Sequence, residues 1–256
     1  MDTQDFSKAQ GHWILAKMGK KVLRPGGKEL TQKLILALNI STQDNIAEFA
    51  PGLGFTANLA LAKQPRSYVG IDADEEAIGL LKTKIKGKHI QFVFGNAAHA
   101  PLENNSKDKV YGEAMLTMQA DHRKSEIIKE AHRVLKKGGL YGIHELGLTG
   151  VDENLKNEIQ KDLAQTIKVN ARPLTQDEWK ALLEKEGFTV KNIFSNEMLL
   201  LEPQRVVADE GFLRSLKISF NILVNSKARK RILEMRKIFR KHQQHMNAVA
   251  IIAEKN

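Results

Sequence analysis

Two kinds of hydrophobic pattern alternate along the first part of the chain. Short runs rich in β-branched and aromatic residues predict buried strands, and longer stretches with apolar residues three or four positions apart predict amphipathic helices. The runs that predict strands span residues 46–50, 68–72, 90–94, 109–116 and 140–143. The stretches that predict helices span residues 56–63, 75–86 and 125–135. This repetition favours right-handed crossovers and a mostly parallel sheet with helices on both faces.

The pattern becomes more helical after residue 146. Helices are expected over 152–167, 175–186 and about 206–244, with strands over 188–201 and 246–253. Thr175 and Glu178 have the spacing of a capping box, which supports a helix start there. The helix over 125–135 is expected to end in a basic turn before Gly138. The predicted parts are a helical cap (1–45), an α/β core (46–202), a helical insertion acting as a lid (203–245) and a final core strand (246–256).

The composition excludes several kinds of site. The chain has 256 residues, of which 42% are hydrophobic and 27% charged, as is typical of a globular protein. It has no cysteine, which removes disulfides, thiolate nucleophiles and cysteine-ligated metals. The sequence has no apolar run of the ~18 residues that a membrane helix needs. Because Met1–Asp5 is polar and acidic rather than typical of a signal peptide, we expect a cytoplasmic protein.

The net charge of +10 is concentrated in one segment. Between Lys227 and Lys241 there are eight basic residues and one acid, Glu234, while the apolar residues fall on one face of a helix. Three interpretations compete: a lid helix with a solvated basic face, peripheral contact with an anionic membrane, and contact with RNA. The last is least favoured because no aromatic stacking pattern accompanies the charge, and we therefore expect no nucleic-acid partner.

The most informative segment joins the first predicted strand to the first predicted helix. Gly52 and Gly54 allow a sharp turn and a close approach of the backbone to a ligand. Asp72 ends the next strand, 20 residues after Gly52, where a carboxylate can accept hydrogen bonds from both ribose hydroxyls of an adenosine. The same spacing also fits a dinucleotide fingerprint or a glycine turn without a ligand.

Two further residues favour a cationic adenosine derivative over a dinucleotide. Glu48 stands four residues before Gly52, and a carboxylate there suits an ammonium or sulfonium group rather than a pyrophosphate. Asn96 follows the third strand, where a side-chain amide can lie beside the adenine edge. The ordered spacing of these elements points to S-adenosylmethionine.

These segments resemble the class I S-adenosylmethionine-dependent methyltransferases, in the branch similar to quinone-biosynthesis and small-molecule enzymes. The matching segments are Glu48–Gly54, Val69–Asp72, Gly95–Ala97 and Arg133–Gly139, and Leu23–Gly27 resembles a segment that closes over the methionine end of the cofactor in relatives. The resemblance implies a Rossmann-like sheet of seven mostly parallel strands with an antiparallel last strand. Two departures stand out: no third glycine follows Gly54, and Asn96 replaces the usual acid of the third motif.

The resemblance implies S-adenosylmethionine as the cofactor and S-adenosylhomocysteine as the product. The residues implied to bind the cofactor are Arg24, Gly26, Gly27, Glu48, Ala50, Pro51, Gly52, Gly54, Asp72, Ala73, Asn96, Ala97, Glu113 and Ala114. The expected reaction is in-line transfer of the methyl group to a small-molecule acceptor. The alternatives are an NAD(P)-dependent oxidoreductase and a non-catalytic adenosyl-binding protein.

Acceptor chemistry is expected where the fourth and fifth strands end. His144 is the candidate general base, and Glu145 is the candidate residue to orient it or to bind a cationic acceptor. His144, Glu145 and Glu113 could also ligate a metal, but no tight ligand spacing supports this, so no metal is predicted. Met115 and Met118 are candidate lining residues of an apolar acceptor pocket.

Overall fold

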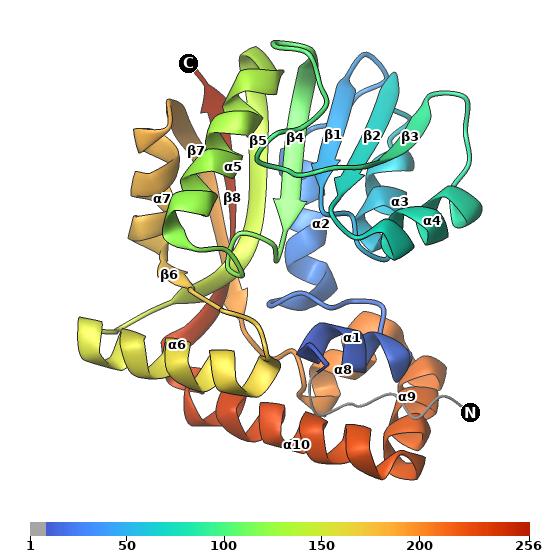
Figure 1. Ribbon diagram of the computed structural model, residues 1–256, viewed down its shortest axis with the longest axis vertical. Coiled ribbons are helices and arrows are strands. Elements are labelled where there is room, and N and C mark those ends of the chain that lie inside the picture. The colour runs from blue at the N-terminus through green and yellow to red at the C-terminus, as the bar shows by residue number, and fades with distance from the viewer. Residues whose placement is uncertain (1–8) are drawn as a thin grey trace.

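The computed structural model describes residues 9–256, and the first eight residues of the predicted cap lie outside this range. A single mixed sheet has the strand order β3-β2-β1-β4-β5-β8-β7, with β6 paired to β5. β8 runs antiparallel to both of its neighbours, and the other pairs of strands are parallel (Figure 1). The Rossmann-like fold with an antiparallel last strand is thereby confirmed. The strands are β1 (Asn45–Phe49), β2 (Ser67–Asp72), β3 (Ile90–Phe94), β4 (Lys107–Glu113), β5 (Leu135–Leu148), β6 (Leu174–Thr175), β7 (Phe188–Glu197) and β8 (Met246–Lys255).

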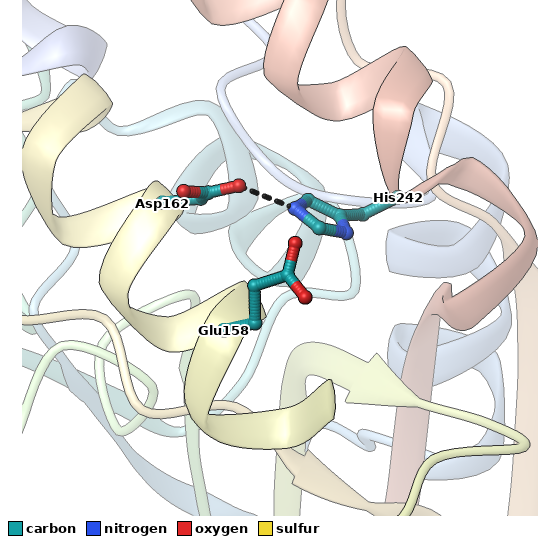
Figure 2. Close-up of side chains that lie close together, drawn as sticks. All are labelled: Glu158, Asp162 and His242. Carbon is teal, nitrogen blue, oxygen red and sulfur yellow. Dashed lines mark hydrogen bonds and ion pairs between the residues drawn. The ribbon is translucent and has the colours of Figure 1, made fainter. Parts of the chain in front are cut away.

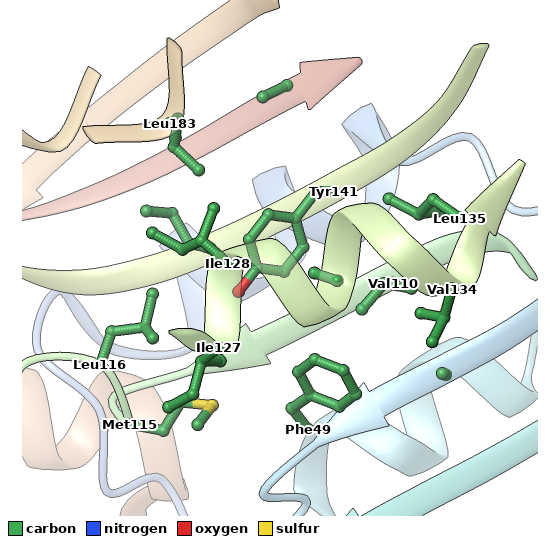
Figure 3. Close-up of a cluster of buried hydrophobic side chains, with 14 of the residues drawn as sticks. Phe49, Val110, Met115, Leu116, Ile127, Ile128, Val134, Leu135, Tyr141 and Leu183 are labelled. Atoms are coloured by element: carbon green, nitrogen blue, oxygen red, sulfur yellow. The ribbon is translucent and has the colours of Figure 1, made fainter. Parts of the chain in front are cut away.

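Helices cover both faces of the sheet because alternate strand residues are apolar on each face. One face packs against α2 (Gly27–Ala37), α3 (Phe55–Leu61) and α4 (Glu75–Lys84). The other packs against α5 (Asp121–Val134) and α7 (Gln176–Lys185), which begins with the predicted capping box. Figure 3 shows the second core, where Phe49, Val110 and Tyr141 of neighbouring strands meet Ile127 and Ile128 of α5.

A layer of helices lies across the carboxyl ends of the parallel strands (Figure 1). We call this layer the lid. Its helices are α1 (Gly11–Lys17), α6 (Glu153–Ile167), α8 (Pro203–Glu210), α9 (Phe212–Val224) and α10 (Ser226–Lys241), followed by the short η1 (Gln243–His245). A small apolar core joins α1 to α10, with Ile14 and Leu15 against Ile232 and Met235. None of the helices within residues 9–256 has the length and apolar composition needed to cross a membrane.

The structure corrects the predicted elements at several points. The single helix expected over 206–244 is three helices, because Gly211, with a φ of 79°, and Asn225, which is extended, adopt non-helical backbone conformations between them. The helix expected to run to residue 135 ends at Val134, and β5 begins at once, so the basic residues before Gly138 belong to a strand. Since β5 continues to Leu148, His144 and Glu145 lie inside it rather than after it. Within residues 9–256, the two-residue β6 makes eight strands instead of the expected seven.

Candidate active site

A cavity of about 590 Å³ lies between the lid and the carboxyl ends of the central strands. One half of it is bounded by the β1–α3 turn, the end of β2, the end of β4 and the loop that joins α1 to α2. The other half is bounded by lid helices and the end of β5. In open α/β sheets this edge is where ligands bind. We refer to these two parts as the polar half and the apolar half.

The β1–α3 turn is held in a compact, strained conformation. Ala50, Gly52 and Gly54 have φ angles of 55°, 55° and 81°. Glycine adopts such angles freely, whereas a residue with a Cβ pays roughly 1–2 kcal/mol. Ala114 at the end of the adjacent β4 also has a φ of 52°. Ala50 and Ala114 both line the cavity, so strained backbone with small side chains faces the space where a ligand would lie.

Asp72 lies beside this turn at the end of β2. Its two carboxylate oxygens accept hydrogen bonds from the backbone N–H groups of Gly52 and Asp74, both at 3.0 Å. Burial raises the pKa of Asp72, and these backbone hydrogen bonds act against the shift. The carboxylate lines the cavity and retains lone pairs that these two bonds do not use, as recognition of a ribose requires.

The most connected side chain of the site is Glu113, the last residue of β4. It accepts hydrogen bonds from Thr31 of α2 at 2.7 Å and from Thr56 of α3, and its oxygen lies 2.5 Å from Nε of Arg24. Nδ1 of His144 lies 2.7 Å from its other oxygen. We call these five residues the Glu113 cluster. Burial alone would raise the pKa of Glu113, but the Arg24 charge and the hydrogen bonds outweigh it and lower the pKa to about 2.

The structure places His144 inside the Glu113 cluster and not in the cavity. The ring is fully buried, with Nε2 2.6 Å from the carbonyl oxygen of Pro25 and Nδ1 facing Glu113. Both ring nitrogens therefore face oxygen atoms of the protein. The prediction of His144 as a general base is wrong, because both ring nitrogens are engaged by protein atoms and the side chain does not line the cavity.

Glu145 points to the opposite face of the sheet, as the next residue along a strand must. It accepts hydrogen bonds from the backbone N–H groups of Met115, Leu116 and Thr117 at 2.8–3.0 Å, and from the Thr117 hydroxyl at 2.7 Å. Glu145 therefore shapes the loop after β4. It neither orients His144 nor completes a metal site with His144 and Glu113, so both interpretations are corrected.

Glu48 is also buried, although the sequence suggested that it faces a cationic ligand. Its carboxylate accepts hydrogen bonds from the hydroxyls of Tyr68 at 2.5 Å and Tyr111 at 2.9 Å. Burial raises the pKa of Glu48 to about 7, against the effect of the two tyrosine hydrogen bonds. In the described structure Glu48 does not line the cavity, unlike the position expected for a residue that faces the ligand.

The predicted cofactor residues therefore divide into two sets. Those that line the cavity are Arg24, Ala50, Pro51, Gly52, Asp72, Glu113 and Ala114. Those that lie around it without lining it in the described structure are Gly26, Gly27, Glu48, Gly54, Ala73, Asn96 and Ala97. Gly26 and Gly27 begin α2 with positive φ, and a Cβ on Gly27 would meet the Asp209 carboxylate at 2.5 Å, so they position the loop that carries Arg24. Asn96 accepts a hydrogen bond from the Ala98 N–H at 2.9 Å and holds its own turn.

The apolar half contains residues that the sequence alone did not single out. Its wall is formed by Leu146, Leu163, Ile167, Met198, Met235 and Phe239, while Met115 and Met118 line the cavity as predicted. Leu163 and Ile167 come from α6, and Met235 and Phe239 come from α10. Their spacing of four was visible in the sequence, but it indicated only a buried helix face and not what that face encloses.

One further group of side chains has the composition of a metal site. Glu158 and Asp162 of α6 face His242 after α10, with ligand atoms within 4.8 Å of one another (Figure 2). Nε2 of His242 lies 2.8 Å from Asp162, and Nζ of Lys241 lies 2.7 Å from both carboxylates. An ammonium group thus occupies the position between the acids, and the group is best described as an ion-pair network that fastens α6 to α10.

Comparisons with known proteins point to one family. Residues 47–143 match the methyltransferase domain family. An uncharacterised protein of Haemophilus influenzae is 36% identical over 250 residues, which cover 96% of this chain and 98% of the relative. An uncharacterised methyltransferase of Synechocystis is 30% identical over 136 residues, or 52% of this chain and 63% of the relative. Among solved structures, the chain resembles phosphoethanolamine N-methyltransferase 2 of Haemonchus contortus in complex with S-adenosyl-L-methionine, with a TM-score of 0.72 and 16% sequence identity. The match covers 96% of this chain and 56% of the Haemonchus chain.

The geometry of the cavity and the comparisons both indicate a methyltransferase domain. The cavity lies at the sheet edge expected for an adenosine ligand, with the Asp72 carboxylate and the tight β1–α3 turn on its wall. The matched region contains both of these features and decides against the nicotinamide-dependent alternative. Residues 47–143 therefore form a methyltransferase domain, and the chain as a whole has the fold of a methyltransferase solved in complex with S-adenosyl-L-methionine.

Proposed function

We propose that the protein transfers the methyl group of S-adenosylmethionine to a small, largely apolar and uncharged acceptor bound beneath the lid. The observation that carries this proposal is the continuity of the cavity. Its polar half, with Asp72 and Arg24, opens directly into the apolar half between α6 and α10. Ligand sites are usually concave and mostly apolar with a few polar groups that fix orientation, as this one is.

The residues of the polar half fit the cofactor. Asp72 would accept hydrogen bonds from the ribose hydroxyls, and the small side chains of Ala50 and Ala114 would allow the backbone to approach the ligand closely. Arg24 lines the same half and would meet the carboxylate of the methionine moiety. When bound, the cofactor supplies an already activated methyl group, so the protein has chiefly to orient the acceptor and exclude water.

The apolar half supports an uncharged acceptor. The residues of its wall are leucine, isoleucine, methionine and phenylalanine, joined by the polar Thr117, Gln119 and Asn170. A charged acceptor group would lose its hydration there without an ionic partner from these residues, which is costly. A concave, mostly apolar cavity of this kind also favours a small molecule over RNA, which binds through extended basic surfaces and stacking.

The cofactor and acceptor parts of the proposal can be tested separately. Asp72→Asn is expected to weaken S-adenosylhomocysteine binding by about 100-fold in calorimetric titration, because a charge-assisted hydrogen bond to the ribose is lost. The exposed Glu75→Gln, at the start of α4, is the matched control and is expected to bind normally. If Asp72→Asn binds as well as the parent, the assignment of the ribose site is wrong.

For the acceptor, Leu200→Glu places a carboxylate in the apolar half, and Leu199→Glu is its neighbour outside the cavity. Methyl release would be measured with radiolabelled S-adenosylmethionine on a metabolite extract and on an RNA fraction. We expect turnover with the extract, loss of that turnover in Leu200→Glu with cofactor affinity retained, and little change in Leu199→Glu. Turnover on the RNA fraction alone would contradict the small-molecule proposal and leave the cofactor assignment intact.

A further inference from the structure

The outer face of α9 is unusual for a protein surface. Six large apolar side chains of this one helix are exposed to solvent, with exposed fractions of 53–81%. They are Phe212, Leu213, Leu216, Phe220, Leu223 and Val224. Scattered apolar residues are normal on a surface, but contiguous apolar patches mark interaction sites.

These six residues form a single stripe, which we call the α9 stripe. At ~100° of rotation per residue they fall within an arc of about 120° on the helix. The opposite face is anchored to the protein: Ser215 and Ile218 are buried, and Nδ2 of Asn221 donates to the carbonyl of Met18 at 2.9 Å. Arg214 also donates to the carbonyl of Gly19. The stripe is therefore the solvent-facing side of a helix whose other side is packed and hydrogen-bonded to the rest of the protein.

Three exposed lysines lie beside the stripe and just after its end. Lys217 lies beside it on α9, and Lys227 and Lys230 are exposed on the first turns of α10, directly after the stripe ends. Arg229 donates to the carbonyl of Leu223, which keeps the start of α10 against the end of α9. Within residues 9–256, none of Lys217, Lys227 and Lys230 forms an ion pair with an acid.

Three of the later basic residues of α10 are engaged in ion pairs, whereas Lys237 is exposed and forms none within residues 9–256. Arg236 and Arg240 both pair with Glu202, and Lys241 pairs with the two acids of α6. The basic segment recognised in the sequence thus has two roles. Its second half fastens the lid together, and its first half leaves cations beside the α9 stripe.

We propose that the α9 stripe and its neighbouring lysines dock the protein on the surface of an anionic membrane. An amphipathic helix with an apolar face and flanking lysines binds in the plane of the interface, with its apolar side chains at the headgroup boundary and its cations near lipid phosphates. Charge complementarity selects this occupant. A second copy joined through the same face would bring equivalent lysines together, which like-charge repulsion opposes.

The undescribed N-terminal residues are a poor alternative cover for the stripe. Residues 1–8 contain only two apolar side chains, Met1 and Phe6, against the six of the stripe. The proposal also differs from the expectation drawn from the sequence, which placed membrane contact in 227–241 as a whole. In the proposal α9 inserts, and only the beginning of α10 supplies charge.

The test uses the full chain and large unilamellar vesicles, either phosphatidylcholine alone or phosphatidylcholine mixed with phosphatidylglycerol. Co-sedimentation is expected with the mixed vesicles and to be much weaker with phosphatidylcholine alone. The double variant Leu216→Glu, Phe220→Glu is expected to lose about tenfold or more in partitioning, because it places carboxylates where apolar groups insert. Leu36→Glu is the matched control, since Leu36 is 72% exposed on α2, and it is expected to partition like the parent.

Two further measurements separate the alternatives. Lys227→Glu, Lys230→Glu is expected to weaken binding to the mixed vesicles and to reduce its dependence on salt. Far-ultraviolet circular dichroism confirms that each variant is folded. The proposal is overturned if the parent does not bind mixed vesicles at low salt, or if the α9 variant binds as well as the parent. It is also overturned if sedimentation shows a dimer that the α9 variant dissociates, since the stripe would then be a contact between copies.

Discussion

Two buried glutamates on the same face of the sheet have opposite ionisation behaviour. Glu48 of β1 receives hydrogen bonds only from neutral tyrosine hydroxyls, and its pKa is raised to about 7. Glu113 of β4 has a guanidinium, a ring nitrogen of His144 and two threonine hydroxyls around it, and its pKa is lowered to about 2. Both are fully buried, so burial does not explain the difference. The charged groups next to each carboxylate explain the difference between the two pKa values.

Glu113 and Glu48 also differ in whether they border the cavity. Glu113 joins the end of β4 to α2, α3, β5 and the loop of Arg24, and it borders the cavity. Glu48 is hydrogen-bonded to Tyr68 and Tyr111, and in the described part of the chain it does not line the cavity. A carboxylate in the expected motif position therefore does not by itself make a ligand contact. The predictions below test how far the two environments differ.

The largest effect is expected for Glu113→Gln. The change leaves the buried Arg24 guanidinium without a compensating negative charge, and breaking a buried pair in this way costs about 3–5 kcal/mol. Urea denaturation monitored by circular dichroism would measure the free energy of unfolding. Glu103→Gln, on an exposed loop, is expected to change it by less than about 0.5 kcal/mol. A similarly small change in Glu113→Gln would show that the cluster does not stabilise the fold.

The pH dependence of stability is expected to have two limbs. Because the pKa of Glu113 is depressed to about 2, its contribution is present above its ordinary pKa of 4.5 and is lost as the pH falls toward 2. Because the pKa of Glu48 is raised to about 7, the folded protein binds a proton that the unfolded chain releases, and stability falls as the pH rises from 4.5 to 7. Each limb amounts to roughly 3 kcal/mol.

The two limbs can be assigned by substitution. Glu48→Gln keeps an oxygen that can accept from both tyrosines and removes the titration, so we expect the decline between pH 4.5 and 7 to disappear while the acid limb remains. Urea midpoints at a series of pH values would show this. An unchanged decline would mean that another group titrates there and that Glu48 is already ionised at low pH.

A smaller effect is expected when one donor to Glu113 is removed. Thr31→Val deletes a hydrogen bond of 2.7 Å to an ionised carboxylate, which is worth about 1.5–3 kcal/mol. Thr83→Val, on an exposed turn of α4, serves as the control and is expected to be nearly neutral. If the two variants have the same denaturation midpoint, the Glu113 carboxylate is adequately satisfied by its remaining partners.

The smallest effect is expected when one donor to Glu48 is removed. Tyr111→Phe removes a neutral hydrogen bond of 2.9 Å, and we expect a loss of about 1 kcal/mol at pH 5, where Glu48 is protonated. At pH 8 the loss should be larger, because the ionised carboxylate depends more strongly on its donors. Equal losses at the two pH values would contradict the assignment of the raised pKa to Glu48.

Much of the polar half of the site was predictable from local sequence. The turn through Gly52 and Gly54 and the carboxylate of Asp72 lie within a short stretch of chain, and the parallel pairing of β1 with β2 brings them to the same edge. The order of strands and helices was equally visible, because hydrophobic periodicity records which faces are buried. The same periodicity could not separate a long helix from three shorter ones at Gly211 and Asn225.

The sequence by itself determined the sheet, the class of enzyme and the position of the cofactor turn, since these depend on local spacing. Only the tertiary structure decided the roles of individual polar side chains. His144 and Glu145 are adjacent in the chain and point to opposite faces of β5, and the partners that engage them come from segments about 30 to 120 residues away. What surrounds a side chain, rather than its place in a motif, fixes its charge and what it can bind.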